Sequence, residues 1–115
     1  MINRAARTTC DLALTDDGFA ATLKSPFGKT ATHSFAWTAI RRIRAVNLDL
    51  TVYDEFALAM EFDGGETLQV TESDGGFFDF GQALTEHLPG VEIDWLAVFT
   101  RPAFEAIDRV VYEKA

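Results

Sequence analysis

The clearest hydrophobic pattern of the chain lies between Glu55 and Leu88, and it predicts a β-hairpin that leads into an amphipathic helix. Apolar side chains alternate along two segments, at Phe56, Leu58, Met60 and Phe62 in the first and at Leu68 and Val70 in the second. A three-residue turn at Asp63-Gly64-Gly65 pairs Met60 with Leu68, whereas a two-residue turn pairs Met60 with a threonine. We therefore predict the three-residue turn, in which Gly65 supplies the positive φ that a bulged hairpin turn requires.

The predicted helix follows a glycine pair, and its apolar residues recur at helical spacing. The apolar stripe comprises Phe77, Phe80, Leu84 and Leu88, with Phe78 beside it. Ser73 or Asp74 is placed to cap the first turn, and Pro89-Gly90 ends the helix. Gly75-Gly76 lacks the lysine of a phosphate-binding loop and has carboxylates nearby, so we interpret it as a strand-to-helix junction.

Alternating residues predict four strands before the hairpin. They run from Thr9 to Thr15, from Phe19 to Leu23, from Lys29 to Trp37 and from Ile43 to Thr51. The third strand presents an inward face of Ala31, His33, Phe35 and Trp37, and the fourth presents Arg44, Val46, Leu48 and Leu50 on one face and Asn47 and Asp49 on the other. Trp37, Ile40 and Ile43 are spaced three apart, which predicts a corner or a single helical turn between these two strands.

Two elements are predicted after the long helix. A short helix from Asp94 through Phe99 presents Trp95, and a final strand runs from Ile107 to Glu113. The last segment also fits a helical period through Phe104, Ile107 and Val111. Its β-branched and aromatic content favours the strand.

The corner and the end of the long helix carry a resemblance to a known group of proteins. The W-x-x-I-x-x-I corner at Trp37, Ile40 and Ile43 and the helix end at Leu88-Pro89-Gly90 make the chain similar to small uncharacterised bacterial proteins with a pleckstrin-homology-like (PH-like) fold. The resemblance implies a mainly β, α+β fold: a curved antiparallel sheet or partly open barrel of six to seven strands, capped by the long helix of the C-terminal half. Phosphoinositide-binding members use a basic loop between their first two strands. Here that loop is Thr15-Asp16-Asp17-Gly18, so we expect no phosphoinositide binding.

Length, composition and charge narrow the functional classes. The chain has 115 residues, 48% of them hydrophobic, so we expect a single domain over residues 1–115, with residues 1–8 as a loose N-terminal tail. The formal net charge of −8 disfavours attraction to nucleic acid or to an anionic membrane surface. No segment reaches the roughly 18 apolar residues of a membrane span, and the first residues lack the apolar run of a signal peptide. We therefore expect a cytoplasmic protein.

The residue types that catalysis or metal binding requires are few and scattered. The two histidines, His33 and His87, have no cysteine at a metal-ligand spacing. We interpret His33 as a hydrogen-bonded core residue and His87 as a side chain that interacts with the end of the helix. The single cysteine, Cys10, follows a strand pattern that buries it as a structural thiol. We therefore expect no catalytic residue, no cofactor and no metal, and hence no enzyme.

Clusters of charged residues have ordinary structural interpretations. The carboxylate pairs Asp16-Asp17 and Asp54-Glu55 can serve acid–base chemistry, but such pairs in connecting turns are usually solvated. The basic cluster of Arg41, Arg42 and Arg44 either binds a phosphate or an acidic partner, or it neutralises part of the acidic surface. The negative net charge favours neutralisation.

Three aromatic residues are not assigned to the predicted core: Phe27 at a turn, Phe78 off the helical stripe, and Trp95. They are the candidate residues of an exposed binding patch. We therefore predict a non-enzymatic interaction module that binds a protein partner or itself, through this patch or through an open sheet edge. The alternative is a small-ligand binding protein or enzyme with a pocket between the sheet and the long helix, lined by His33, Trp37 and nearby carboxylates.

Overall fold

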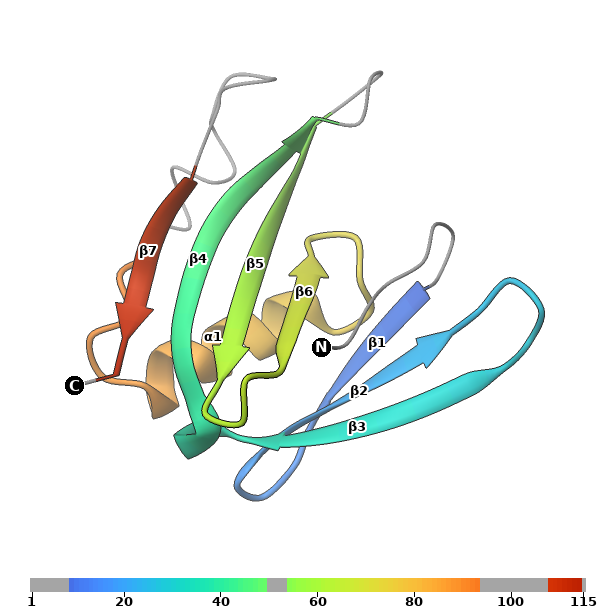
Figure 1. Ribbon diagram of the computed structural model, residues 1–115, viewed down its shortest axis with the longest axis horizontal. Helices are drawn as coiled ribbons and strands as arrows, with labels where there is room; N and C mark the ends of the chain where they lie inside the picture. Colours follow the sequence, from blue (N-terminus) through green and yellow to red (C-terminus); the bar gives the residue numbers. More distant parts are fainter. Residues whose placement is uncertain (1–8, 50–53, 94–107, 115) are drawn as a thin grey trace.

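The structure is a computed structural model that describes residues 9–49, 54–93 and 108–114. Within these ranges, seven strands form two antiparallel sheets beside one α-helix, and neither sheet closes into a barrel (Figure 1). The three-stranded sheet has the order β1-β2-β3 and the four-stranded sheet has the order β6-β5-β4-β7. The elements are β1 (Thr9–Leu14), β2 (Gly18–Lys24), β3 (Thr30–Ala36), the 3-10 helix η1 (Trp37–Ala39), β4 (Ile40–Asp49), β5 (Asp54–Phe62), β6 (Thr67–Thr71), α1 (Phe77–His87) and β7 (Asp108–Glu113). The expected α+β class is confirmed.

The hairpin between β5 and β6 has the register that side-chain parity predicts. Met60 pairs with Leu68, and both side chains are buried. The turn closes through hydrogen bonds from the Phe62 amide to the Glu66 carbonyl (2.9 Å) and from the Gly65 amide to the Phe62 carbonyl (2.9 Å). Gly65 has a φ of 86°, which is the left-handed conformation expected of the last residue in a three-residue turn.

The corner between the two sheets is also present, and it shifts the strand that follows. Trp37 begins η1, and β4 starts directly after it at Ile40 rather than at Ile43. The buried face of β4 carries Ile43 and Ala45, so Arg44 and Val46, which we grouped on one face, lie opposite the core. Ala45 is too small to stand out in a hydrophobic pattern, although it belongs to the buried core. The last segment is a strand, as preferred, and it pairs antiparallel with β4.

The start of α1 differs from the predicted cap. Gly76 is the N-cap residue in a left-handed conformation (φ 75°), and no side chain caps the helix. Asp74 instead accepts a hydrogen bond from the Thr71 amide (2.8 Å), which closes the turn after β6. The cap prediction was therefore wrong, because the helix begins at Phe77 and its N-cap residue is Gly76, which lies beyond both Ser73 and Asp74. The prediction of a strand-to-helix junction at the glycine pair is confirmed: a Cβ on Gly76 would lie 2.2 Å from the Leu12 carbonyl oxygen.

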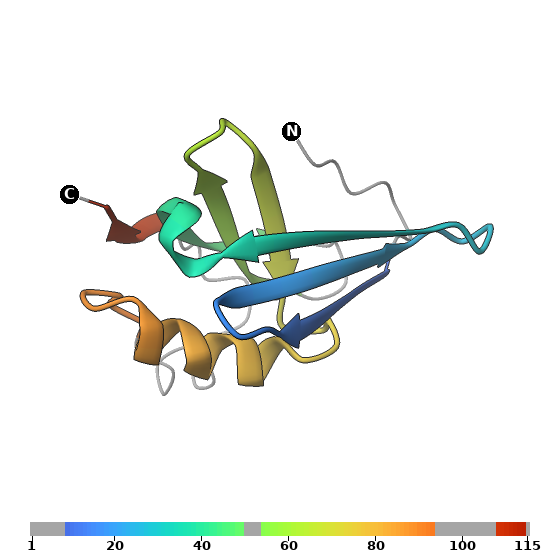
Figure 2. The ribbon, with the colours of Figure 1, turned by 90° about the horizontal axis from the view of Figure 1, so that it is seen from below.

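The helix lies across one side of the molecule and packs on both sheets (Figures 1 and 2). The Phe80 ring is 4.8 Å from that of Phe19 in β2, and the Phe77 ring is 6.2 Å from that of Phe56 in β5. Each of these rings is nearly inaccessible to solvent, so the helix joins the two sheets into one core. Cys10 is buried in the same core, as predicted.

Some predictions concern parts of the chain that the structure does not describe. The N-terminal tail 1–8, the short helix from Asp94 through Phe99, and Trp95 within it lie outside the described residues. Among the helices of residues 9–49, 54–93 and 108–114, none has the length and apolar character required to cross a membrane.

Candidate functional site

The two described aromatic residues of the proposed binding patch, Phe27 and Phe78, do not lie on one surface. Phe27 is 91% exposed in the turn between β2 and β3, and Phe78 is 53% exposed in the first turn of α1. Both ribbon views place that β-turn at the far end of a projecting hairpin, away from the start of α1 (Figures 1 and 2). Trp95 lies outside the described residues. The two described aromatics therefore belong to separate parts of the surface, and only Phe27 stands almost fully in solvent.

The turn that carries Phe27 has the same construction as the β5–β6 turn. The Ser25 amide donates to the Lys29 carbonyl (2.8 Å), and the Gly28 amide donates to the Ser25 carbonyl (3.1 Å). Gly28 has a φ of 86°. Phe27 is therefore the middle residue of a three-residue turn, where the core cannot bury it.

The hydrogen bonds of this hairpin fix which backbone groups of β3 point outward. Ser25 bonds to Lys29 at one end, and the Trp37 amide donates to the Asp17 carbonyl (3.0 Å) at the other. In an antiparallel pair the bonded positions alternate, so the odd-numbered residues of β3 bond to β2. The even-numbered residues direct their amide and carbonyl groups to the outer edge; they are Thr30, Thr32, Ser34 and Ala36.

The outer edge of β3 receives no hydrogen bond from residues 9–49, 54–93 or 108–114, whereas the other three sheet edges in that part of the chain are partly covered. On β1, the Leu12 amide donates to the Gly75 carbonyl (2.8 Å). On β7, the Val111 carbonyl accepts from the Glu92 amide (2.8 Å). On β6, the Thr71 amide donates to Asp74. Figure 1 shows β3 along the margin of the molecule, so its edge faces outward.

The chemistry of β3 suits contact with another chain. Its seven residues, TATHSFA, carry no Asp, Glu, Lys or Arg in a protein of net charge −8. Its burial falls toward the hairpin turn: Phe35 is buried, His33 is half-buried and Ala31 is exposed. The predicted inward face is therefore correct for Phe35 but wrong for Ala31, because the hairpin extends beyond the core that covers its base.

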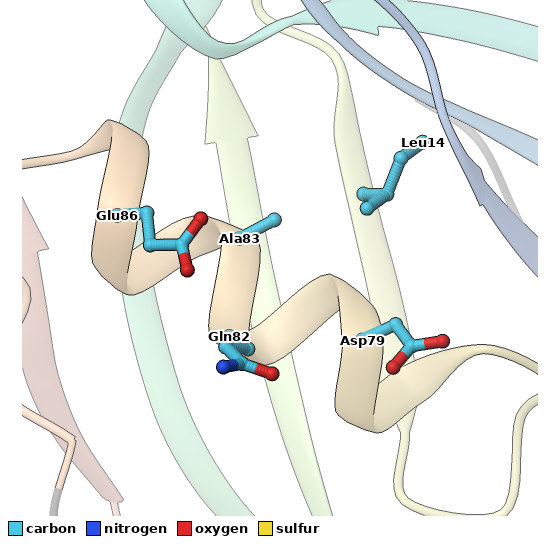
Figure 3. Close-up of a pocket in the computed structure, with 5 residues that line it drawn as sticks. All are labelled: Leu14, Asp79, Gln82, Ala83 and Glu86. Carbon is cyan, nitrogen blue, oxygen red and sulfur yellow. The ribbon is translucent and has the colours of Figure 1, made fainter.

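A shallow pocket of about 230 Å³ lies between the end of β1 and α1 (Figure 3). Leu14 and Ala83 supply its apolar part, while Asp79, Gln82 and Glu86 supply polar groups from one side of the helix. Its volume is below the range of about 300–1,000 Å³ that is typical of ligand sites. Leu14 alternates with Cys10 and Leu12 along β1, but unlike these two buried residues it is 51% exposed.

The pocket predicted between sheet and helix was expected to include His33 and Trp37, and neither lines the pocket in Figure 3. The Trp37 ring stacks on that of His87 at 5.3 Å and on that of Phe80 at 5.9 Å. The indole of Trp37 therefore packs against these two rings. His87 lies in the last turn of α1, as predicted.

The carboxylates near the β6–α1 junction form structural hydrogen bonds. Glu55 was expected in a solvated pair, but it is 7% exposed and accepts hydrogen bonds from the Ser73 amide (3.1 Å) and the Ser73 hydroxyl. Glu72 accepts from the Phe56 amide (2.8 Å). These carboxylates satisfy backbone donors where β6 turns into the helix. Within the described ranges no group of three or more His, Cys, Asp and Glu is arranged to hold a metal ion.

Two arginines of the basic cluster, Arg42 and Arg44, pair with acidic side chains of the same protein. Arg44 forms hydrogen bonds to both carboxylate oxygens of Asp108 at 2.6 Å, and these bonds raise the pKa of Arg44 above its usual value. Arg42 lies 3.3 Å from Glu61 and 3.2 Å from Glu113. This pairing fits the interpretation that the cluster neutralises acidic surface.

Comparisons of the chain with protein-family models, with curated proteins and with solved structures found no match. The functional proposals therefore rest on the residues and geometry of this chain. The feature with the strongest chemical argument is the outer edge of β3 together with Phe27, which we call the β3 edge surface. Sequence reasoning proposed an open sheet edge without saying which one, because alternation identifies a strand but not its neighbours. The absence of charge from residue 30 to residue 36 was the available signal.

Proposed function

We propose that this protein is a non-enzymatic, PH-like interaction module that binds a protein partner or a second copy of itself through the β3 edge surface. The observation that carries the proposal is a seven-residue strand with outward amide and carbonyl groups and no charged side chain. An extended segment of another chain can add to such an edge through backbone hydrogen bonds. Phe27, beside the edge, supplies an aromatic side chain of the kind that anchors protein interfaces. Nucleic acid, membranes and phosphoinositides are not the expected partners, given the acidic charge and the acidic turn between β1 and β2. We propose a cytoplasmic location.

The test removes one outward hydrogen-bond donor and leaves the hairpin paired. Thr32→Pro deletes an amide hydrogen that points away from β2, and proline is tolerated at edge positions of this kind. Thr32→Val is the matched control, because it makes a similar change to the side chain and keeps the amide. Circular dichroism and urea unfolding establish that each variant folds.

Association is measured in two ways, by sedimentation of the purified protein over a range of concentrations and by affinity capture with the protein as bait. We expect Thr32→Pro and Phe27→Ala to weaken association at least tenfold, and Thr32→Val to leave it nearly unchanged. If the wild-type protein shows neither self-association nor a partner, or if Thr32→Pro binds as the wild type does, the proposal is wrong.

A second candidate is binding of a small cationic ligand in the pocket between β1 and α1. It is supported by the carboxylates of Asp79 and Glu86, which line the pocket together with the apolar side chains of Leu14 and Ala83 (Figure 3). A thermal-shift screen of amines and other metabolites tests it. Stabilisation that Glu86→Gln abolishes and Glu66→Gln preserves would favour this candidate; Glu66 is exposed in the β5–β6 turn.

A further inference from the structure

We propose that the occupant of the β3 edge is the β3 strand of a second copy, paired antiparallel about a twofold axis at His33. This inference rests on the proposed function and names its partner. It predicts a continuous six-stranded sheet in which the three-stranded sheets of two copies meet edge to edge.

The register follows from the backbone directions of the strand. Hydrogen bonds between two β3 strands require outward-pointing residues on both, and these are the even-numbered residues. His33 is the midpoint of Thr30–Ala36, so a twofold axis there pairs the whole strand. Thr32 then exchanges hydrogen bonds with Ser34 of the second copy, and Thr30 with Ala36 of the second copy. Moving the twofold axis by one residue along the strand reduces the number of β3 residues that pair between the two copies.

The side chains at the centre of this pairing are compatible with a self-contact. His33 faces His33 of the second copy in a non-hydrogen-bonded pair, where opposing side chains approach most closely. Its own cross-strand neighbour is Ala21, which is buried and uncharged. Exposed Ala31 lies beside Phe35 of the second copy. No pair along the strand places like charges opposite each other.

Charge complementarity supports a second copy at the ends of the strand. The same register places Lys29 beside Trp37 of the second copy, whose backbone bonds to Asp17 of that copy. Two strand spacings, about 10 Å, then separate Lys29 from the Asp16–Asp17 turn. Lys29, Asp16 and Asp17 are exposed and form no ion pair with the described residues of their own chain. The twofold axis makes this lysine–aspartate approach twice.

The register also gives Phe27 a contact. The turn of each hairpin extends past the end of the partner β3, so Phe27 reaches the η1 corner of the second copy, where Ala39 is partly buried against the core. Figure 1 shows the half of β3 next to the β2–β3 turn along the margin of the molecule, with β2 and β1 on its other side. A seven-residue pairing with two aromatic contacts is smaller than the interfaces of about 1,200 Å² found in stable complexes, so we expect a reversible dimer.

Disulfide trapping at single positions tests the axis. In the proposed pairing the Cα atoms of the two residues 33 lie about 4.5 Å apart, within the range for a disulfide, whereas the two residues 31 are offset by four residues, or about 13 Å. We expect His33→Cys to form a covalent dimer under mild oxidation, and Ala31→Cys, the matched control, to remain at least tenfold less cross-linked. Cys10 is buried, and its replacement by serine in both variants removes it from the experiment.

Charged variants test the same contact without covalent trapping. His33→Asp and His33→Lys each place like charges across the axis, so each variant should dimerise at least tenfold more weakly than the wild type. An equimolar mixture should recover association as a heterodimer, whereas the pair Thr85→Asp and Thr85→Lys on exposed helix surface should show no such exchange. Circular dichroism of each variant checks its fold.

The outcomes separate this inference from the proposed function. Covalent dimers at position 33 alone, with recovery in the charged mixture, support the twofold pairing. Equal cross-linking at positions 31 and 33, or no recovery in the mixture, refutes it. A monomeric wild type that captures another protein in a manner sensitive to Thr32→Pro refutes the self-pairing and leaves the proposed function standing.

Discussion

Replacement of Gly76 by alanine tests how closely α1 approaches β1. Gly76 has a φ of 75°, and a Cβ at this position would lie 2.2 Å from the Leu12 carbonyl oxygen, a backbone atom. Real contacts of a Cβ are essentially never under 3.0 Å, so either the strand or the junction must move by most of an ångström. Such a shift lengthens the hydrogen bonds that join Gly75 to β1, from the Leu12 amide (2.8 Å) and to the Cys10 carbonyl (3.1 Å).

The expected loss of stability has separate parts. Holding alanine in the left-handed conformation costs about 1 kcal/mol. Weakening the two backbone hydrogen bonds at Gly75 costs about 1 kcal/mol each. We therefore expect Gly76→Ala to lower the free energy of unfolding by about 3 kcal/mol, which is a large effect for one substitution.

Gly65→Ala is the matched control for this measurement. Gly65 has a φ of 86°, but a Cβ there would meet nothing within 4 Å, so only the conformational cost of about 1 kcal/mol remains. Both substitutions change the unfolded chain in the same way. Urea unfolding of the two variants gives the difference, which should be about 2 kcal/mol. If both variants lose the same stability, the close approach of the junction to β1 is not present.

Three other measurements address the core and the buried polar groups. Phe80→Ala removes a ring that packs on Phe19 at 4.8 Å and should lower the free energy of unfolding by about 3–5 kcal/mol. Phe78→Ala on the same helix, at a half-exposed position, should lower it by under about 1 kcal/mol. Similar losses for the two variants in urea unfolding would contradict the packing described. Glu55→Ala removes a buried carboxylate together with its hydrogen bonds from the Ser73 amide and hydroxyl, and it should cost about 2 kcal/mol. Glu66→Ala in an exposed turn should change the unfolding free energy by under about 0.5 kcal/mol. Cys10 is 2% exposed, so it should react with a thiol reagent only as the protein opens, and much faster in concentrated urea. Rapid reaction of the native protein would show that the core does not bury Cys10.

The correct predictions from the sequence concern local geometry. The pairing of Met60 with Leu68 follows because one register buries every large side chain of the hairpin, and the alternative exposes them. The corner at Trp37 follows from a change of period within a few residues. In both cases the deciding residues are close together in the sequence, so their pattern contains the information.

The incorrect predictions concern residues whose partners are distant or in competition. Glu55 resembles a solvated loop residue in the sequence, but Ser73 folds over it and supplies its hydrogen bonds. Asp74 was placed to cap the helix, but the N-cap position is Gly76, and the Asp74 carboxylate accepts a hydrogen bond from the Thr71 amide (2.8 Å). Ala45 shares the buried face of β4 with Ile43, but its small side chain does not mark that face in the sequence. The strand order β6-β5-β4-β7 is likewise not encoded in a local pattern. The identity of the open edge depends on the same strand order.

The outer edge of β3 lacks the protection that the other described sheet edges have. Natural proteins protect edges with charged residues, proline, bulges or covering segments, because an unprotected edge pairs with other chains. In the described part of this chain, Gly75 forms backbone hydrogen bonds to the edge of β1, and the Glu92 amide donates to the edge of β7. On β6, the Asp74 carboxylate accepts a hydrogen bond from the Thr71 amide. Within the same described ranges, β3 has none of these devices along its seven residues. A single lysine or aspartate at an exposed position such as Thr32 would supply one at small cost to stability. The nearest lysine, Lys29, lies just outside the strand, where the twofold pairing brings it toward an acidic turn. If the β3 edge faced only solvent, the position of Lys29 would contribute nothing to it. In the twofold pairing, Lys29 approaches the acidic turn of the second copy and so helps to fix the register of the two strands.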